Sequence, residues 1–259
     1  MEAAALSAFK TRFLDILFPP QCLKCASLVA ETGTLCATCW LKISFIDGAC
    51  CEACGLPFEY DLGPAALCGA CSQDRPLFSR ARSAMIYNAA SRDIILAFKH
   101  GDKTHAVAAY GKWLFRAGSK MSPEIDVIVP VPLHWSRLFH RRYNQAALLA
   151  IEFSKLSGIP ARTNILRRHK KTASQGHKTV RARHTNLRGA FSVPSRAKAG
   201  IKDKKILLID DVLTTGATAQ ACTKILLQAG VKNVDVLTLA RVVRTEIATP
   251  AQSDDDALT

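Results

Sequence analysis

The sequence has no long run of apolar residues. A membrane span needs about 20 consecutive apolar residues, and a secretion signal needs a basic start followed by an apolar core. Charged side chains interrupt any such pattern near the N-terminus: Glu2, Lys10, Arg12 and Asp15. We therefore expect a cytoplasmic protein without membrane insertion. Apolar residues recur at helical spacing over 6–18, which predicts a short amphipathic helix packed on the body of the protein.

Acidic residues are almost missing from residues 133–205. This stretch holds 18 of the 35 basic side chains but only two acidic ones, Glu152 and Asp203, so it alone carries a formal charge of +16. Five of the seven histidines also lie there, so a lower pH adds further positive charge. The pattern indicates a polyanionic partner such as pyrophosphate, a nucleotide or nucleic acid. The alternative, a solvated basic face with no specific ligand, is disfavoured because acids are nearly excluded.

Cysteine, in contrast, is abundant and concentrated in one part of the chain. Nine of the ten cysteines fall between residues 22 and 71. Eight of them form four Cys-x-x-Cys pairs: Cys22/Cys25, Cys36/Cys39, Cys51/Cys54 and Cys68/Cys71. Two such turns can complete the tetrahedral set of thiolates that Zn²⁺ prefers, so four pairs predict two structural zinc sites. Gaps of ten and thirteen residues favour pairing of consecutive turns, while an interleaved pairing stays open.

A disulfide framework is the competing interpretation of these cysteines. With no secretion signal we expect a reducing compartment, which favours metal binding over disulfides. A thioredoxin-like redox site is disfavoured, because the four pairs lie in Gly- and Pro-containing segments with no room for a βαβ unit. Modules of this kind are usually structural scaffolds, and contact with DNA or a partner stays open as the alternative.

Strand and helix patterns alternate from residue 82 onward. We predict strands at 82–87, 126–131, 206–209 and 234–239. We predict helices at 91–99, 105–117, 144–157 and 217–229, the last two ended by Gly158 and Gly230. This alternation is typical of an α/β fold with a parallel sheet and helices on both faces. We expect an N-terminal helix and double zinc-ribbon module over 1–76, the α/β domain over 77–248, and a disordered tail over 249–259.

The segment 206–218, ILLIDDVLTTGAT, joins a predicted buried strand to a predicted helix. Asp210 and Asp211 are expected at the tip of that strand, where parallel sheets bind their ligands. Two adjacent carboxylates repel each other unless hydroxyl groups or a metal bind them. Gly216 allows close approach of an anion, and the helix N-terminus adds free N–H groups and a favourable dipole. The segment therefore predicts a site for a phosphorylated, hydroxyl-bearing ligand.

This segment resembles the phosphoribosyl pyrophosphate motif of type I phosphoribosyltransferases. The resemblance implies that the α/β domain has the type I fold and that Asp210 and Asp211 bind the ribose hydroxyls. It also implies that one loop wraps the ribose phosphate: Thr214, Thr215, Gly216, Ala217 and Thr218. Mg²⁺ is expected to bridge the pyrophosphate and the ribose, in keeping with its preference for phosphate oxygens.

The order of motifs along nearly the whole chain is similar to that of the ComF family. Cysteine pairs come first and are followed by PVPLHWSRLFHRRYNQA, RRHKKTASQ and NLRGAF. That family is associated with natural competence and DNA uptake, so competence proteins and single-stranded DNA are candidate partners. One departure is Arg142, because the family usually has Gly before the aromatic-Asn-Gln sequence that is here Tyr143-Asn144-Gln145.

For an enzyme, the resemblance implies substitution at the anomeric carbon of phosphoribosyl pyrophosphate as pyrophosphate leaves. Positive charge near the leaving group then matters most. We expect Arg137 and Arg141, in a loop after the 126–131 strand, to hold the pyrophosphate, since a guanidinium matches phosphate oxygens. We expect the basic stretch 167–188 to form a mobile loop or hairpin that closes over the site, with Arg168 and Lys171 as catalytic residues.

Two other interpretations of the chain stay open. In the first, the basic surface and the zinc ribbons bind single-stranded DNA without turnover, although only three aromatics, Trp135, Phe139 and Tyr143, accompany the basic residues. In the second, the phosphoribosyl site is a sensor that regulates assembly. No purine- or pyrimidine-reading motif in the sequence indicates an acceptor.

Overall fold

The computed structural model describes residues 19–100, 106–170, 187 and 189–243. Its strands are β1 (Ala81–Ile86), β2 (Val127–Pro130), β3 (Arg167–Arg168), β4 (Phe191–Ser192), β5 (Lys205–Leu213) and β6 (Asn233–Arg241). Its helices are α2 (Ala37–Trp40), α3 (Gly69–Gln73), α4 (Ala89–His100), α5 (Val107–Gly118), η2 (Ser122–Glu124), α6 (Trp135–Arg141), α7 (Gln145–Ser157), α9 (Ser195–Lys198) and α10 (Ala217–Gln228). The helix predicted over 6–18 and the tail 249–259 lie outside the described residues.

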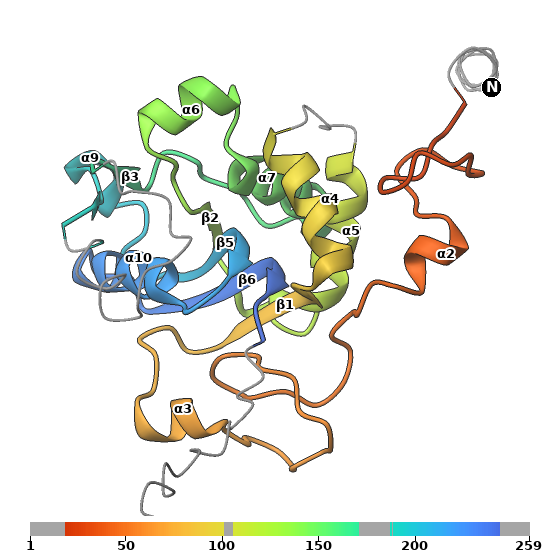
Figure 1. The fold of residues 1–259 in the computed structure, drawn as a ribbon. Coiled ribbons are helices and arrows are strands. Elements are labelled where there is room, and N and C mark those ends of the chain that lie inside the picture. Colours follow the sequence, from red (N-terminus) through yellow and green to blue (C-terminus); the bar gives the residue numbers. More distant parts are fainter. Residues whose placement is uncertain (1–18, 101–105, 171–186, 188, 244–259) are drawn as a thin grey trace, which may run out of the picture.

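Four strands form the central sheet in the order β1-β6-β5-β2, and all of its pairings are parallel. The inner strands β5 and β6 are the longest, and Figure 1 shows them running through the middle of the domain. The carboxyl ends of parallel strands lie at one edge of a sheet, so the ends of β2, β5 and β6 lie close together. That edge is the one that the predicted ligand site requires.

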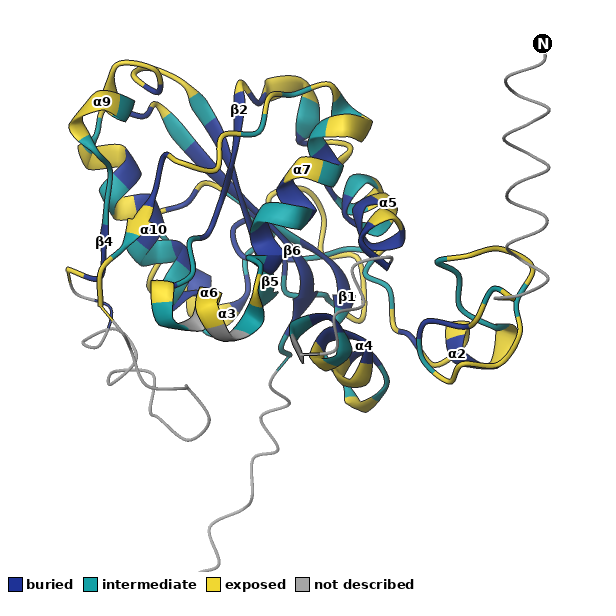
Figure 2. Cartoon of the chain, turned by 90° about the horizontal axis from the view of Figure 1, so that it is seen from above, coloured by how far each residue is buried: buried dark blue, intermediate teal, exposed yellow. Residues whose placement is uncertain are grey.

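Alternate residues of the strands serve two separate cores, one on each face of the sheet. Leu207 and Ile209 of β5 join the core formed with α4, α5 and α7. Ile206 and Leu208 join the opposite core, which includes residues of α10. Strands covered on both faces are mostly apolar, which accounts for the buried sheet at the centre of Figure 2. The predicted α/β fold, with a parallel sheet and helices on both faces, is confirmed.

Two predicted elements differ from the structure at the ligand edge. β5 extends to Leu213, so Asp210 and Asp211 lie within the strand and not beyond its tip, because β6 continues to pair with it as far as Arg241. The segment predicted as a loop after β2 contains the helix α6. The His134 side chain accepts from Ser136 N–H and caps this helix, whose large apolar residues are exposed and show no core-facing pattern.

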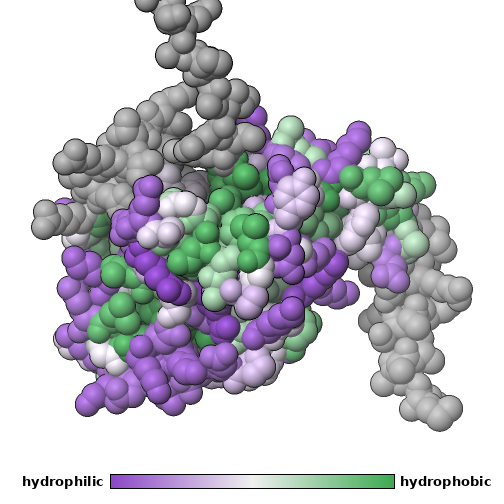
Figure 3. Space-filling model, turned by 90° about the horizontal axis from the view of Figure 1, so that it is seen from below, coloured by the Kyte–Doolittle hydropathy of each residue, from purple (hydrophilic) through white to green (hydrophobic). Residues whose placement is uncertain are grey.

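The two cysteine-rich segments pack on different parts of the α/β domain. The segment with α2 projects on the right in Figure 1 and touches α4, where Lys24 Nζ lies 3.3 Å from Asp93 Oδ2. Figure 3 shows apolar surface on this projecting arm, which carries the exposed side chains of Leu28 and Leu41. The segment with α3 lies below the sheet, next to β1, and Ala81 N–H donates to Ala53 O at 2.8 Å. None of the described helices is long and apolar enough to cross a membrane.

Candidate functional site

Asp210 and Asp211 lie at the C-terminal end of β5, at the edge expected for a ligand. Asp210 Oδ1 accepts from Asp211 N–H at 2.9 Å, which restrains the orientation of the Asp210 carboxylate. Asp211 Oδ2 lies 3.0 Å from Lys99 Nζ, at the end of α4, and both side chains are about one-fifth exposed. Partial burial strengthens this ion pair relative to a surface pair. Lys99 is therefore a site residue that the sequence interpretation missed.

The electrostatics of the site differ between the two carboxylates. Burial, together with the charge of Asp211, raises the pKa of Asp210 to about 7, while the positive charges of Lys99 and Arg168 oppose that rise. Arg168 thus lies close enough to act on Asp210, although it belongs to β3, which pairs with β4 in a separate two-stranded sheet. Its guanidinium carbon lies 5.4 Å from the centre of the Phe191 ring. A ligand that needs carboxylate acceptors beside positive charge matches this arrangement.

The phosphate loop Thr214–Thr218 leads from the end of β5 into the first residues of α10. Gly216 has φ +77° and precedes the first residue of α10, so only glycine takes this backbone position without strain. In the described part of the chain, Thr215 Oγ1 is buried and has no hydrogen-bond partner. Buried hydroxyl groups usually have a partner, and an anion bound at a helix N-terminus is one group that supplies it.

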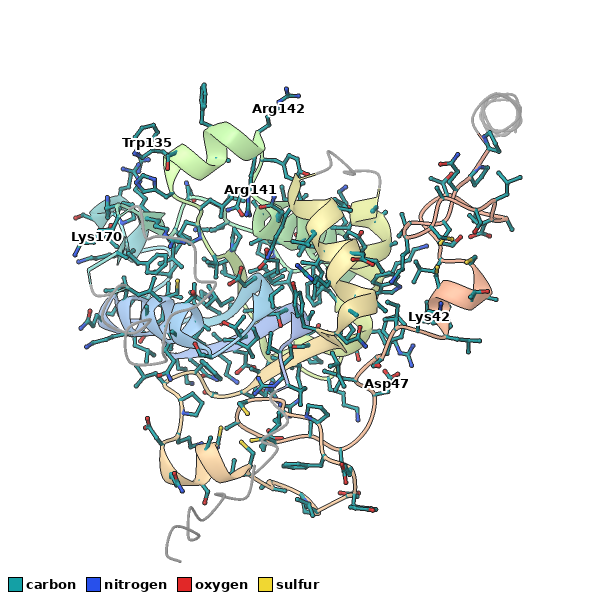
Figure 4. All side chains as sticks on the ribbon, in the orientation of Figure 1. Lys42, Asp47, Trp135, Arg141, Arg142 and Lys170 are labelled. Carbon is teal, nitrogen blue, oxygen red and sulfur yellow. The ribbon has the colours of Figure 1, made fainter. Side chains whose placement is uncertain are left out.

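The predicted basic residues are only partly brought to the site. Arg137 and Arg141 lie on α6 and not in a loop, and Arg141 Nη1 donates to Gln145 Oε1 at 3.4 Å. Figure 4 shows Arg141 below α6, toward α7, whereas Arg142 extends away from the domain. Lys171 and most of the 167–188 stretch lie outside the described residues, and Arg168 is the one predicted catalytic residue that the structure describes.

The eight predicted metal ligands form two clusters, each with four sulfurs within 4.8 Å of one another. The first cluster is Cys22, Cys25, Cys36 and Cys39, and the second cluster is Cys51, Cys54, Cys68 and Cys71. Consecutive pairing is confirmed, and the interleaved pairing is wrong. Backbone N–H groups of Cys36 and Cys68 donate to sulfurs of Cys22 and Cys51, both at 3.3 Å. Four converging sulfurs with N–H donors fit a structural zinc site.

A buried arginine connects the second cluster to the central sheet. Arg241, the last residue of β6, donates from Nη1 to Cys54 O at 2.5 Å and from Nη2 to Cys54 Sγ at 3.2 Å. Burial raises the pKa of Cys54 to about 11, and the Arg241 charge opposes that rise. Sequence interpretation missed this contact, because Cys54 and Arg241 are 187 positions apart.

The fold and the site define the chain as a phosphoribosyltransferase-type domain joined to two cysteine clusters. Residues 145–255 match the phosphoribosyl transferase domain, and residues 13–72 match the double zinc ribbon domain. The chain is 30% identical over 228 residues to competence protein F of Haemophilus influenzae, covering 85% of this chain and 96% of that protein. It therefore belongs to the ComF family of competence and DNA utilization proteins.

Other relatives show the same extent of similarity. Competence protein ComFC of Bacillus subtilis is 29% identical over 222 residues, which cover 83% of this chain and 87% of that protein. DNA utilization protein YhgH of Salmonella typhi is 31% identical over 199 residues, covering 74% and 84%. Among solved structures, purine phosphoribosyltransferase from Pyrococcus horikoshii is 21% identical and covers 54% of this chain and 84% of that one, with a TM-score of 0.33. A score of that size carries no argument about the ligand.

Proposed function

We propose that the carboxyl edge of the sheet binds phosphoribosyl pyrophosphate. Asp210 and Asp211 accept from the ribose hydroxyls, and the loop Thr214–Thr218 holds the ribose phosphate. The observation that carries this proposal is the buried Thr215 hydroxyl without a partner, which lies beside Gly216 at the start of α10. A phosphate oxygen there would satisfy that hydroxyl and interact with the free N–H groups of the helix.

The leaving pyrophosphate needs compensating positive charge on the same edge. Arg168, whose charge acts on Asp210, and Lys99, which pairs with Asp211, are the described residues that supply it. Ligand binding draws Lys99 away from Asp211, because the carboxylate turns to the ribose while the ammonium turns to phosphate oxygens. Lys171, which lies outside the described residues, and Arg137 and Arg141 of α6 are the further basic residues that the sequence predicts for the pyrophosphate. Mg²⁺ belongs with the pyrophosphate and ribose of the bound ligand.

Replacement of Asp210 and Asp211 together by Asn tests ligand binding. The double variant keeps the size of both side chains but removes the pure acceptor character that the hydroxyls require, so binding should be lost. Calorimetry with magnesium present measures the affinity, and thermal unfolding checks the fold. Asp126→Asn is the matched control, because Asp126 is an exposed aspartate at the opposite end of the sheet, bonded to Lys205 N–H. Equal affinity in the double variant and the wild type would refute the assignment.

Turnover is the second step of the proposal. In it, pyrophosphate leaves the anomeric carbon and an acceptor nucleophile takes its place. Screening nucleobases and amines for pyrophosphate release, with Arg168→Met as the inactive control, tests this step. A protein that binds the ligand but releases no pyrophosphate with any acceptor fits the sensor interpretation instead.

A second candidate function, binding of single-stranded DNA, has its own structural support on α6. Trp135 and Phe139 are 72% and 84% exposed and lie four positions apart on this helix, so they share one face. Tyr143 does not join them, because its hydroxyl donates to Phe98 O at 2.8 Å. Arg142 and Lys170 are exposed nearby in the basic stretch, and Figure 4 shows Trp135 and Arg142 extending outward from α6. Exposed aromatics beside basic residues suit stacked bases and phosphates.

Anisotropy titrations of a labelled oligothymidine test this candidate. Each stacked base is worth about 1–3 kcal/mol, so Trp135→Ala with Phe139→Ala should weaken binding at least tenfold. The slope of log K against log salt should stay near −0.7 per phosphate contact, because the basic residues are unchanged. Tyr60→Ala, an equally exposed aromatic outside the basic stretch, is the control. Undetectable affinity of the wild type at low salt would remove the candidate.

A further inference from the structure

Arg241 is buried at the boundary between the second cluster and the ligand edge. It is 9% exposed, and within the described residues its side-chain hydrogen bonds go to Cys54 O and Cys54 Sγ. Among the described residues, no carboxylate lies within ion-pair distance of its guanidinium. A buried guanidinium without an anionic partner is costly, so the thiolates of the second cluster are its counter-charge. Four thiolates around Zn²⁺ carry a net charge of −2, which an arginine at one sulfur partly offsets.

The backbone of the same arginine supports the phosphate loop. Arg241 is the register partner of Leu213, the last residue of β5, and Leu213 is followed directly by Thr214. Val242 N–H donates to Leu213 O at 2.9 Å, and Tyr87 N–H donates to Arg241 O at 2.7 Å. Backbone hydrogen bonds to the C-terminal end of β6, where Arg241 lies, therefore fix the position at which the Thr214–Thr218 loop leaves β5.

Phe78 makes a second connection between the same two parts. It follows the second cluster closely in sequence and is 3% exposed. Two of its ring carbons lie 3.9 and 4.0 Å from the point where a Cβ on Gly216 would stand, so the ring packs against the loop. The first cluster is attached elsewhere, through Lys24, which donates to Ala90 O at 3.0 Å and pairs with Asp93 of α4.

We propose that Arg241 is a positioning residue through which the second cluster, with its zinc, holds the loop Thr214–Thr218 in its binding conformation. Loss of metal from the second cluster then loosens the phosphate site, whereas the first cluster has no such effect. The role of Arg241 in ligand binding rests on the proposed function. The structural coupling between the second cluster and the Thr214–Thr218 loop is independent of the proposed function.

Replacement of Arg241 by Met, with Lys24→Met as the matched control at the first cluster, tests the proposal. Loss of a partner to a metal ligand typically costs 10–100-fold in metal affinity. A chelator should therefore remove zinc from the second cluster of Arg241→Met at least tenfold faster, as read from alkylation of Cys51 and Cys54 against Cys22 and Cys25. Amide exchange over 213–218 should rise in the free protein, and the affinity for phosphoribosyl pyrophosphate should fall at least tenfold. Lys24→Met should leave the loop exchange and the affinity unchanged.

Wild-type zinc retention and loop exchange in Arg241→Met would overturn the proposal, as would equal loop loosening in Lys24→Met. If Arg241→Met does not fold, graded removal of zinc from the wild-type protein replaces it. Amide exchange over 213–218 should then rise in parallel with alkylation of Cys51 and Cys54. A rise in parallel with alkylation of Cys22 and Cys25 instead would refute the proposal. Failure of the wild type to bind phosphoribosyl pyrophosphate would refute the proposed function alone, because the zinc and exchange measurements do not use that ligand.

Discussion

Asp210 and Asp211 are adjacent in sequence but differ in their partners. Sequence reasoning treats them as two carboxylates that repel each other in the free protein. In the structure Asp211 forms an ion pair with Lys99. Asp210 is buried beside the Asp211 charge, so ionisation of its carboxyl group is the unfavourable one. Asn at both positions would therefore relieve repulsion at Asp210 and also leave Lys99 without its partner. A single substitution separates the two effects.

We predict that Asp210→Asn stabilises the protein in a pH-dependent way. Because the pKa of Asp210 is raised to about 7 in the folded protein, protonation of this carboxyl group favours the folded state. That contribution to stability is fully present below the ordinary aspartate pKa near 4 and is lost as the pH rises through 7. The gain from Asn should thus be small near pH 4 and grow up to about pH 8. Each unit of pKa shift corresponds to about 1.4 kcal/mol, so the gain should reach a few kcal/mol.

Urea unfolding at a series of pH values measures this effect. Asp126→Asn is a control of opposite sign, because the hydrogen bond from Lys205 N–H lowers the pKa of Asp126. Its carboxylate contributes stability above the ordinary aspartate pKa, and the Asn variant should lose that contribution there. A gain for Asp210→Asn that does not change with pH would show that Asp210 is ordinary in its titration.

At the scale of elements, the helix α6 shows where local patterns are insufficient. The predicted helix 144–157 corresponds closely to α7, because Asn144 caps its start and Gly158 ends it with φ +74°. The helix α6 has no apolar face toward a core, since Trp135 and Phe139 point to solvent, and its periodicity is uninformative. The extension of β5 past Ile209 likewise depends on its pairing with β6.

The same helix explains the departure at Arg142. Arg142 follows α6 with φ +62°, in the left-handed region that favours glycine. The glycine that is usual in the ComF family at this position therefore suits the left-handed backbone conformation found here. We predict that Arg142→Gly stabilises the protein by up to about 1 kcal/mol, since the left-handed conformation costs other residues ~1–2 kcal/mol and the freedom of glycine in the unfolded chain offsets part of it.

Gly158→Ala is the matched reverse of this substitution. Gly158 also ends a helix with a positive φ, and a Cβ there would meet nothing within 4 Å. The only cost of alanine at this position is therefore its strained backbone conformation. It should destabilise the protein by about 1 kcal/mol. Urea unfolding of both variants measures the two effects. A loss of stability in Arg142→Gly would mean that contacts of the arginine side chain outweigh backbone strain.

At the scale of the whole molecule, the two clusters predict about two zinc ions per chain, on the ground that each offers four converging sulfurs. Metal analysis of the purified protein measures the ratio. Cys51→Ser should lower it by about one, whereas Cys50→Ser should leave it unchanged, because Cys50 belongs to neither cluster. A folded protein without metal and with free thiols would contradict the assignment.

The amino-acid sequence by itself determined the elements that depend on local pattern. Four Cys-x-x-Cys turns predicted the two cysteine clusters, alternating strand and helix periods predicted the parallel sheet, and Asp-Asp followed by Thr-Thr-Gly predicted a candidate ligand loop. Tertiary structure alone decided which residues from distant segments meet: Lys99 with Asp211, Arg168 near Asp210, and Arg241 with Cys54. Spacing along the chain reports a helix turn or a strand pleat, whereas these contacts arise from packing of the two cores and of the cysteine-rich segments on the sheet.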